Sequence, residues 1–346
     1  RFMPIFICMI PTAHQMINCF RSCEFLDVRS DFTVWNDAII KSGGLNSIEM
    51  CGSSSPDQTK FIPNSAQNIM QHQEGTFAGG GNLTLYYQSW HPSVPPHAIV
   101  TIVHGLGAHS GWFANLVRCL VENGYAVYGF DLRGHGRSAG QRGYINSWEE
   151  FRSDIRAFRQ LIALAAADLP CFLLGHSLGG TIVLDYVLRD PTSFQGAIAM
   201  APALEHVGIP PVRLGIGYIL SAVCPRFALD TGIGLAVGAR DPELLNAFDR
   251  DPLRHRQGTA RLVTEFFKTV DWIESHISQL QIPLLILHGD ADQVAFPETS
   301  RRLYNLATIA DKELQEYPGL YHELHHDFDY EQVLSDLVAW LARHLV

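Results

Sequence analysis

The chain has 346 residues, 47% of them hydrophobic and 17% charged, so it is long enough and apolar enough to bury a substantial core. Its formal net charge of −10 at pH 7 excludes a protein whose main task is binding nucleic acid, because phosphate recognition needs a basic surface. The same charge argues against strong attraction to anionic lipid, although apolar contact with a bilayer stays open.

The first part of the chain differs in composition from the rest. Residues 1–69 hold four of the seven cysteines and a run rich in Ser, Gly and Pro, with no sustained period of a helix or a strand. The apolar opening is short and broken by two prolines, well below the roughly 20 residues that span a bilayer. We expect residues 1–74 to be an N-terminal extension, disordered or non-native, with Met70 near the natural start. Residues 75–346 are expected to form one domain.

The seven cysteines suggest neither a disulfide framework nor a zinc site. Cys19 and Cys23 have a ligand-like spacing, but no second pair completes a site. Free, mostly buried thiols are typical of a reducing compartment, so a cytoplasmic location is predicted, with no metal and no other cofactor.

From residue 75 onward, strand patterns alternate with helix patterns. The expected strands begin with 82–90, whose alternation is that of an edge strand, and end with 313–318. Between them are the largely apolar runs 98–105, 126–131, 171–175, 196–201 and 283–289. The expected helices are 111–124, 147–168, 179–190 and 330–345, the second with a capping box of Ser147 and Glu150. This alternation predicts an α/β fold, with a mostly parallel sheet covered by helices on both faces.

Residues 206–280 interrupt the alternation with mainly helical signals. The stretch 210–225 is unusually apolar, with little polar relief. The segment could simply pack on an edge of the sheet. We favour a helical lid over a functional site, with one exposed apolar helix.

The segment "GHSLGG" places Ser177 between a predicted strand and a predicted helix. A serine hydroxyl attacks a carbonyl only with a base to take its proton, a carboxylate behind the base and N–H donors for the oxyanion. Gly175 and Gly179 let the chain turn sharply and expose the hydroxyl. A structural turn or a phosphate-cradling loop is the alternative, but the strand–turn–helix context favours a nucleophile.

The partners of such a serine are expected later in the chain, the acid before the histidine. Asp292 and Asp290 both follow a buried strand, and Asp292 is favoured by its spacing between the glycine that ends the strand and the next proline. Asp290 is expected to make turn hydrogen bonds. His322 follows the last strand and is the predicted base, whereas His325 and His326 are expected at the surface or at a helix start.

The loop in "HGLGAHSGWF" is expected to supply the remaining part of the site. The backbone N–H groups of Leu106 and Leu178 would form the oxyanion hole. His104 is expected to brace this loop, and His109 is not the expected base.

The segment 130–148 invites two other interpretations. Asp131 lies too early in the chain for the triad acid. Arg133, His135 and Arg137 could suggest a phosphate site, but no P-loop pattern surrounds them. A hydrogen-bonded structural loop beside the site is expected.

Together, "HGLGAHSGWF", "GFDLRGHGRSAGQRGYI", "GHSLGG", "ARDPELLNAFDRDPL", "HGDADQVAFP" and "YPGLYHELHHD" resemble the α/β-hydrolase superfamily, in particular its monoacylglycerol lipase and lysophospholipase branch. The resemblance covers roughly residues 75–346. It departs at Ala108, where the family often has Glu, and it gives the lid segments "RDP" and "DPL" no chemical role that we can derive. It implies hydrolysis of carboxylic esters with one acyl chain, without a metal, and a lid that can contact membranes.

The sequence therefore predicts a serine hydrolase of lipid-like monoesters, either monoacylglycerols or lysophospholipids. Ser177, His322 and Asp292 would be the triad, and the apolar stretch 210–225 would help to bind the acyl chain. A short-chain carboxylesterase, a thioesterase, an acyltransferase or a peptidase remain alternatives on this fold, as does an inactive hydrolase-fold binding protein. Dehalogenase and epoxide-hydrolase chemistry are disfavoured, because both use Asp at this turn. The expected partners are a lipid ester and a membrane surface touched by the lid, not nucleic acid; the oligomeric state stays open.

Overall fold

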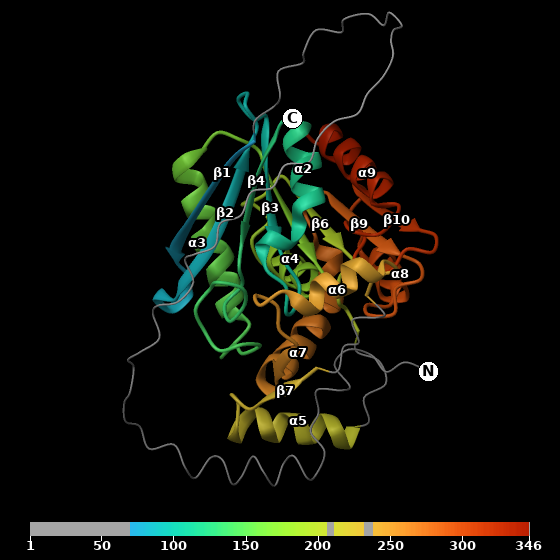
Figure 1. The fold of residues 1–346 in the computed structure, drawn as a ribbon. Coiled ribbons are helices and arrows are strands. Elements are labelled where there is room, and N and C mark those ends of the chain that lie inside the picture. The colour runs from blue at the N-terminus through green and yellow to red at the C-terminus, as the bar shows by residue number, and fades with distance from the viewer. Residues whose placement is uncertain (1–69, 206–210, 232–237, 346) are drawn as a thin grey trace, which may run out of the picture.

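The computed structural model describes residues 70–205, 211–231 and 238–345 (Figure 1). The predicted extension, up to residue 69, lies outside the described residues. The first strand begins at Gln71, a few residues before the boundary at residue 75 that the sequence suggests.

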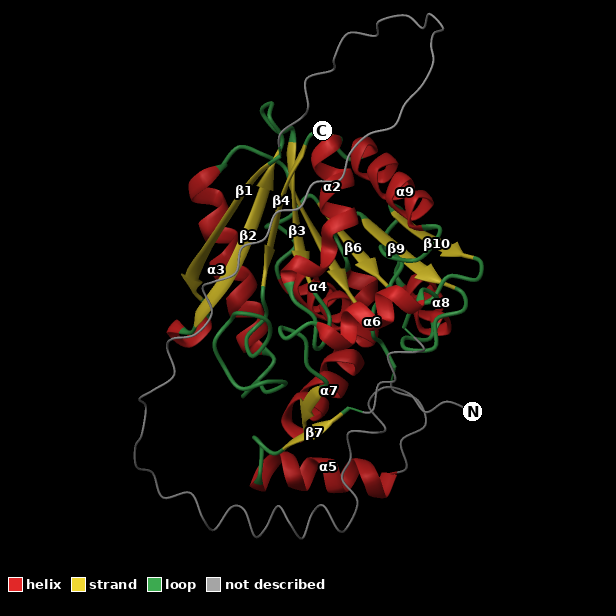
Figure 2. Ribbon diagram, viewed as in Figure 1, coloured by secondary structure: helices red, strands yellow, loops and turns green. Residues whose placement is uncertain are grey.

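A single sheet of eight strands forms the centre of the molecule, in the order β1-β2-β4-β3-β5-β6-β9-β10 (Figure 2). The strands are β1 (Gln71–Ala78), β2 (Thr84–His91), β3 (Ala98–Val103), β4 (Tyr125–Phe130), β5 (Cys171–His176), β6 (Gly196–Met200), β9 (Leu284–Gly289) and β10 (Lys312–Tyr317). Strand β2 is antiparallel to both neighbours, and every other pair is parallel. The sheet is therefore mostly parallel, as predicted. The expectation that residues 82–90 form an edge strand is wrong, because β1 covers that side.

Helices cover both faces of the sheet, since alternate strand residues point to opposite sides. In β5, Leu173 packs in one apolar cluster and Leu174 in the other. The first cluster includes helices α3 (Glu149–Ala165), α4 (Leu178–Arg189) and α8 (Pro297–Leu306); the second includes α2 (Ala114–Glu122) and α9 (Tyr330–Arg343). Both faces of the central strands are thus buried, which explains their continuous apolar runs.

The start of α3 differs from the predicted capping box. The residue preceding the helix is Trp148, and no side chain caps the N-terminus. The Glu150 carboxylate instead accepts a hydrogen bond from the Asn146 N–H at 2.8 Å and pairs with Arg133 at 3.1 Å. The Glu150 carboxylate therefore bonds one residue before the predicted cap, and it links the start of α3 to the loop that carries Arg133.

An insertion enters after β6 and returns before β9. Its described elements are α5 (Pro211–Val223), β7 (Ala228–Asp230), α6 (Pro242–Arg250), β8 (Gln257–Thr259) and α7 (Ala260–His276), followed by the short turn η4 (Ile277–Gln279). Strands β7 and β8 form a small antiparallel pair that the sequence did not predict. Figure 1 shows α5 at the bottom of the view, with β7 and α7 between it and the sheet.

The two long helices of the insertion have different surroundings. Helix α7 buries Phe266 and Val270 in the main core beside α4, so it belongs to the helical layer of the domain. Helix α5 packs against α7 through Ser221, whose hydroxyl lies 2.8 Å from that of Thr264. Its outer side exposes apolar side chains, including Ile219 at 60%. Among the described residues, no helix is both long and apolar enough to cross a membrane.

Candidate active site

Ser177 lies in a tight turn between β5 and α4. Its backbone has φ 55° and ψ −121°, a strained conformation for a residue with a side chain. A Cβ atom on Gly175 would lie 2.2 Å from the Gly179 carbonyl oxygen, and one on Gly179 would lie 2.1 Å from the Val103 oxygen. Only glycine fits at these two positions, so the sequence dictates the sharp turn that presents the Ser177 hydroxyl.

The structure brings the predicted acid and base together from two loops. Asp292 follows β9, His322 follows β10, and His322 Nδ1 lies 2.7 Å from Asp292 Oδ2. The other oxygen, Asp292 Oδ1, accepts hydrogen bonds from the N–H groups of Val294 at 2.7 Å and Ala295 at 3.0 Å. These bonds fix the carboxylate so that one oxygen faces the imidazole.

The electrostatics of this pair suit a base oriented by an anion. Burial alone would raise the pKa of Asp292, but His322 and His288 outweigh it and hold that pKa well below its usual range. Burial alone would lower the pKa of His322, but the Asp292 carboxylate outweighs it, so that pKa is raised. Asp292 is therefore an anion at neutral pH, and it stabilises positive charge on His322.

His288 supports the acid and was not predicted from the sequence. Its Nε2 lies 3.2 Å from Asp292 Oδ2, and its Nδ1 lies 2.7 Å from the Ser300 hydroxyl. The only sequence signal is a histidine at the end of an otherwise apolar strand, four positions before the acid.

A pocket opens between these groups. Its lining residues are Gly105, Leu106, Ala108, His176, Ser177, Gly238, Phe248, Arg254, Val294, His322 and Glu323. The predicted nucleophile, the predicted base and the predicted oxyanion loop thus surround one cavity. No described residue of 210–225 lines it; the insertion contributes Gly238, Phe248 and Arg254 instead. A separate hollow between α2 and α9 contains none of the predicted catalytic residues.

The two predicted oxyanion donors belong to the same region. Leu106 lines the pocket, and Leu178 is the first residue of α4, where a helix leaves its N–H groups without partners. Within the described part of the chain, neither backbone N–H group donates a hydrogen bond. Both remain available to a ligand, and the α4 N-terminus favours negative charge there.

His104 and Asp290 have the structural roles that the sequence suggests. His104 Nδ1 lies 2.7 Å from the Gly105 oxygen, and its Nε2 accepts a hydrogen bond from the Leu132 N–H at 2.9 Å. Asp290 is exposed and accepts a hydrogen bond from the Gly319 N–H at 2.6 Å. The first braces the loop 104–109, and the second closes a turn.

The expectation that His325 and His326 lie at the surface or at a helix start is wrong. His325 is fully buried and stacks on Phe113 with 4.6 Å between ring centroids. His326 Nε2 lies 2.5 Å from the Trp112 carbonyl oxygen. The loop after β10 packs against the segment that leads into α2, a contact between distant parts of the sequence that local patterns do not reveal.

The segment around Asp131 is a structural loop, as predicted. The Asp131 carboxylate accepts hydrogen bonds from the Ser110 N–H at 2.7 Å and from the Arg137 N–H at 2.8 Å. Arg133 Nε lies 2.7 Å from Asp154, in a buried ion pair with α3. These contacts hold the loops after β3 and β4 together beside the site.

The "RDP" and "DPL" segments connect the insertion to the site. Asp251 Oδ2 lies 2.7 Å from His109 Nε2, and the His255 N–H donates to the Gly107 oxygen at 3.1 Å. At the other end of α6, the Arg240 guanidinium pairs with Asp327. No role for these residues could be predicted from local patterns, because their partners are more than 80 positions away in the chain.

Glu205 is a buried acid near the triad, and the sequence did not predict its position there. It follows β6 and is 2% exposed, and its Oε1 accepts a hydrogen bond from the Phe296 N–H at 2.6 Å. Burial raises the pKa of Glu205 to about 7, with the Asp292 charge acting in the same direction. Its Oε2 has no hydrogen-bond partner among the described residues. Glu205 therefore braces the loop that carries Asp292 and places a titratable group beside the base.

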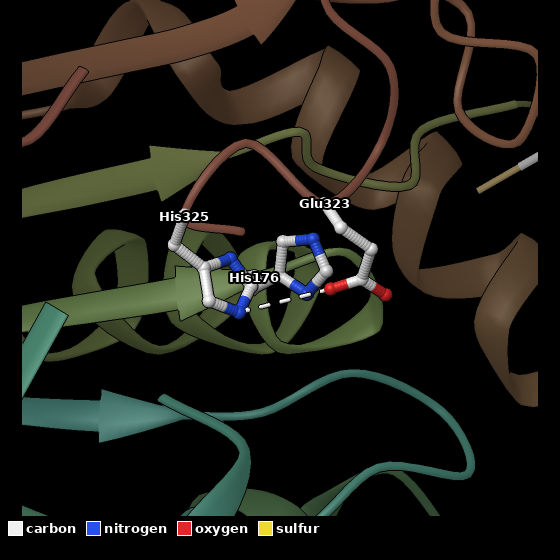
Figure 3. Close-up of side chains that lie close together, drawn as sticks. All are labelled: His176, Glu323 and His325. Carbon is white, nitrogen blue, oxygen red and sulfur yellow. Dashed lines mark ion pairs between the residues drawn. The ribbon is translucent and has the colours of Figure 1, made fainter. Parts of the chain in front are cut away.

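Figure 3 shows His176, Glu323 and His325 close together. All three are buried, and their ligand atoms lie within 4.8 Å of one another. Two imidazoles and a carboxylate are a ligand set that zinc accepts, but tetrahedral zinc with bonds of about 2.1 Å holds its ligand atoms about 3.4 Å apart. His325 Nε2 and Glu323 Oε2 lie 3.7 Å apart, so the group would have to contract to hold an ion.

The chain is similar in sequence to known hydrolases. A family model described as serine aminopeptidase, S33, matches residues 94–329. A monoacylglycerol lipase of Mycolicibacterium smegmatis is 34% identical over 79% of this chain and 98% of its own length. A caffeoylshikimate esterase of Arabidopsis thaliana is 32% identical over 70% of this chain and 76% of its own length.

A solved structure has the same fold. The monoacylglycerol lipase of Paleococcus ferrophilus superposes with a TM-score of 0.69 and 32% identity, over 75% of this chain and 99% of that chain. The predicted fold class and the resemblance stated from the motifs are both confirmed by these matches.

Proposed function

The chain belongs to the serine aminopeptidase S33 family, on the α/β-hydrolase fold, and from that premise we propose a serine mechanism acting on monoacyl lipid esters. It is a carboxylic ester hydrolase. The observation that carries the mechanism is the placement of Ser177 at a strained turn, in one pocket with a histidine that an anionic Asp292 orients.

In the first half of the reaction, Ser177 Oγ attacks the ester carbonyl carbon while His322 Nε2 takes the hydroxyl proton. The Asp292 carboxylate at Nδ1 holds the imidazole in the required tautomer and stabilises the imidazolium. The N–H groups of Leu106 and Leu178 stabilise the oxyanion. Collapse of the tetrahedral intermediate expels the alcohol, which takes the proton from His322 and leaves an acyl group on Ser177.

In the second half, water replaces the alcohol. His322 removes a proton from the water as its oxygen attacks the acyl carbon, and the same donors stabilise the second oxyanion. Breakdown releases the carboxylic acid, and the proton returns from His322 to Ser177 Oγ. No redox step or further reagent is needed.

Two observations support a lipid ester over other esters. Relatives matching this chain at 34% and 32% identity are monoacylglycerol lipases. Helix α5 exposes the side chains of Tyr218, Ile219 and Val223, which suits contact with acyl chains or a bilayer. In this proposal the insertion is a lid that touches lipid, and either a monoacylglycerol or a lysophospholipid supplies the ester.

We also propose a cytoplasmic location, peripheral to membranes. Cys119 and Cys171 are free thiols, which are typical of a reducing compartment.

A second candidate is an esterase of small or aromatic esters. The caffeoylshikimate esterase of Arabidopsis thaliana, at 32% identity, is the observation that favours it. It would use the same three residues, and only the pocket would differ.

A fluorophosphonate probe tests the mechanism, because it phosphonylates an activated serine. Wild-type protein should label at one site, whereas Ser177→Ala should fold and remain unlabelled. Ser335→Ala, which changes an exposed serine on α9, is the matched control and should label like the wild type. A folded wild type that fails to label would overturn the proposed mechanism.

Chain-length dependence separates the two candidates. Rates across p-nitrophenyl esters should rise from acetyl to medium-chain acyl groups if a lipid chain is bound. A clear preference for acetyl would favour the small-ester candidate instead.

A further inference from the structure

Two oppositely charged side chains lie at the wall of the pocket without using their full hydrogen-bonding capacity. Arg254, from the loop after α6, and Glu323, from the loop after β10, both line the pocket with Ser177 and His322. Arg254 Nη1 and Glu323 Oε2 are buried and have no hydrogen-bond partner in the described part of the chain. Buried polar atoms normally have hydrogen-bond partners, so we expect both atoms to bond to polar groups of a ligand.

Arg254 is held by aromatic rings rather than by an acid. Its guanidinium carbon lies 4.0 Å from the ring centroid of Phe248 and 4.8 Å from that of Trp112. Cation–π contacts occupy the face of the guanidinium and leave N–H groups at its edge free to donate. The rings therefore fix the position of the charge without neutralising it.

Glu323 is held in place through its backbone. Its N–H donates to the Gly238 oxygen at 3.0 Å. Burial would raise the pKa of Glu323, but His176, Arg254 and His322 together outweigh that effect and keep this pKa below its usual range. The two imidazoles beside it in Figure 3 are neutral at pH 7, because burial lowers the pKa of His176 to about 4 and that of His325 well below normal.

Arg254 and Glu323 form no ion pair with each other among the described residues. A donor and an acceptor thus both line the pocket that contains the nucleophile. A hydroxyl group both accepts and donates, so an alcohol with free hydroxyls next to its ester oxygen could bond to both residues.

We propose that Arg254 and Glu323 form a binding subsite for the alcohol part of the ester and select a neutral polyol such as a glyceryl group. This inference rests on the proposed function, since the subsite lies beside Ser177. In it, one free hydroxyl accepts a hydrogen bond from Arg254 and another donates to Glu323.

The charges also decide between the two lipid classes left open above. Arg254 is the single cationic side chain among the described residues that line the pocket, and Glu323 and the triad acid offset it. A phosphate on the alcohol would be attracted to Arg254 but repelled by the two carboxylates. A monoacylglycerol therefore fits the subsite better than a lysophospholipid.

The first experiment compares alcohols on the wild-type enzyme. Glyceryl, hydroxypropyl and propyl esters of decanoic acid differ only in the number of free hydroxyls, and decanoyl lysophosphatidic acid carries a phosphate in place of one glyceryl hydroxyl. We expect kcat/KM to fall about tenfold with each hydroxyl removed, and to be lowest for the phosphate ester, because a hydrogen bond to a charged group is worth about a tenfold change in affinity or more. Equal values for glyceryl and propyl esters would overturn the subsite.

The second experiment assigns the selectivity to the two residues. Glu323→Gln and Arg254→Met should each lower the ratio of kcat/KM for glyceryl decanoate to kcat/KM for propyl decanoate by about tenfold. The ratio is taken within one enzyme, so losses common to both substrates cancel. Glu313→Gln and Arg343→Met break an exposed ion pair of the same chemistry between β10 and α9, and should leave the ratio unchanged.

The outcomes separate this inference from the proposed function. A folded wild type that hydrolyses none of these esters contradicts the proposed function itself. A wild type that hydrolyses them all, with a ratio that neither substitution changes, leaves the function intact and overturns the subsite. If a variant fails to fold, the comparison of alcohols on the wild type still decides the inference.

Discussion

His109 Nε2 and Asp251 Oδ2 lie 2.7 Å apart although 142 positions separate the two residues. His109 ends the loop that carries the proposed oxyanion donor Leu106, and Asp251 directly follows α6 of the insertion. The His255 N–H bonds the same loop at the Gly107 oxygen. The insertion and the oxyanion loop therefore hold one another in place.

Asp251→Ala should weaken catalysis by loosening this contact. We expect kcat to fall about tenfold, because a shift of the Leu106 N–H reduces oxyanion stabilisation without removing a donor. Asp241→Ala is the matched control. Both aspartates bond the N–H two residues later, at 2.8 Å for Asp251 and 2.9 Å for Asp241, but only Asp251 contacts His109. Steady-state kinetics that show equal losses in the two variants would contradict the coupling.

Asp292→Asn should separate orientation of the base from folding of the loop. An amide can still accept the hydrogen bonds from Val294 and Ala295, but it cannot hold the protonated Nδ1 of His322 with a negative charge. We expect kcat to fall by roughly a thousandfold to ten-thousandfold with little change in KM. Asp290→Asn, two residues away and exposed, should change kcat less than about twofold. A similar loss of kcat in both variants would show that Asp292 is not the triad acid.

Glu205→Gln should shift the pH profile of the enzyme. Burial lowers the pKa of His322, and Asp292, Glu323 and Glu205 raise it above its usual value. Catalysis needs the neutral base, so kcat/KM is lost as the pH falls through this raised pKa. Without the Glu205 charge the pKa of His322 is lower, and the acid limb should move to lower pH. Glutamine keeps the acceptor for the Phe296 N–H, so the fold should hold.

The control for that profile is Glu298→Gln, which removes a carboxylate whose side chain is 71% exposed in the first turn of α8. Solvent screens this charge, and the acid limb should stay in place. A shift to higher pH in Glu205→Gln, or none, would show that Glu205 does not act on the base.

Replacing the exposed apolar residues of α5 should reduce contact with lipid. The double substitution Ile219→Ser and Val223→Ser removes side chains that are 60% and 56% exposed. We expect sedimentation with phosphatidylcholine vesicles to fall at least tenfold, while hydrolysis of a water-soluble p-nitrophenyl ester is kept. Leu164→Ser, at a leucine of α3 that is 92% exposed, is the control and should bind vesicles like the wild type. Equal binding by all three proteins would exclude α5 as the contact.

Much of the fold could be predicted because each central strand buries both faces and reads as a continuous apolar run. The first strand could not, since the Gln71–Ala78 segment is mostly polar and exposed and is held by pairing with β2. The pair β7 and β8 was not predicted for a related reason. Each has three residues and depends on a partner far along the chain, which no local period records.

Some residues of the candidate site could also be predicted from the sequence, and others could not. Ser177, Asp292 and His322 could be proposed because each follows a recognisable strand in a fixed order along the chain. Glu205 and Glu323 could not, because nothing in their neighbours says which atoms they face. Their roles depend on packing between loops, which arises only when distant strands meet at one edge of the sheet.

The strand order has a consequence for the evolution of substrate selectivity on this fold. The insertion leaves from β6, which lies between β5, the strand before the nucleophile, and β9, the strand before the acid. Lengthening or replacing that one stretch of sequence alters the part of the pocket lining that the insertion supplies. Every strand that leads to a triad residue keeps its neighbours in the sheet. We therefore expect that exchanging residues 206–280 between relatives changes the preferred substrate while the triad stays in place, provided that the new segment keeps the contacts of Asp251 and His255 with the oxyanion loop.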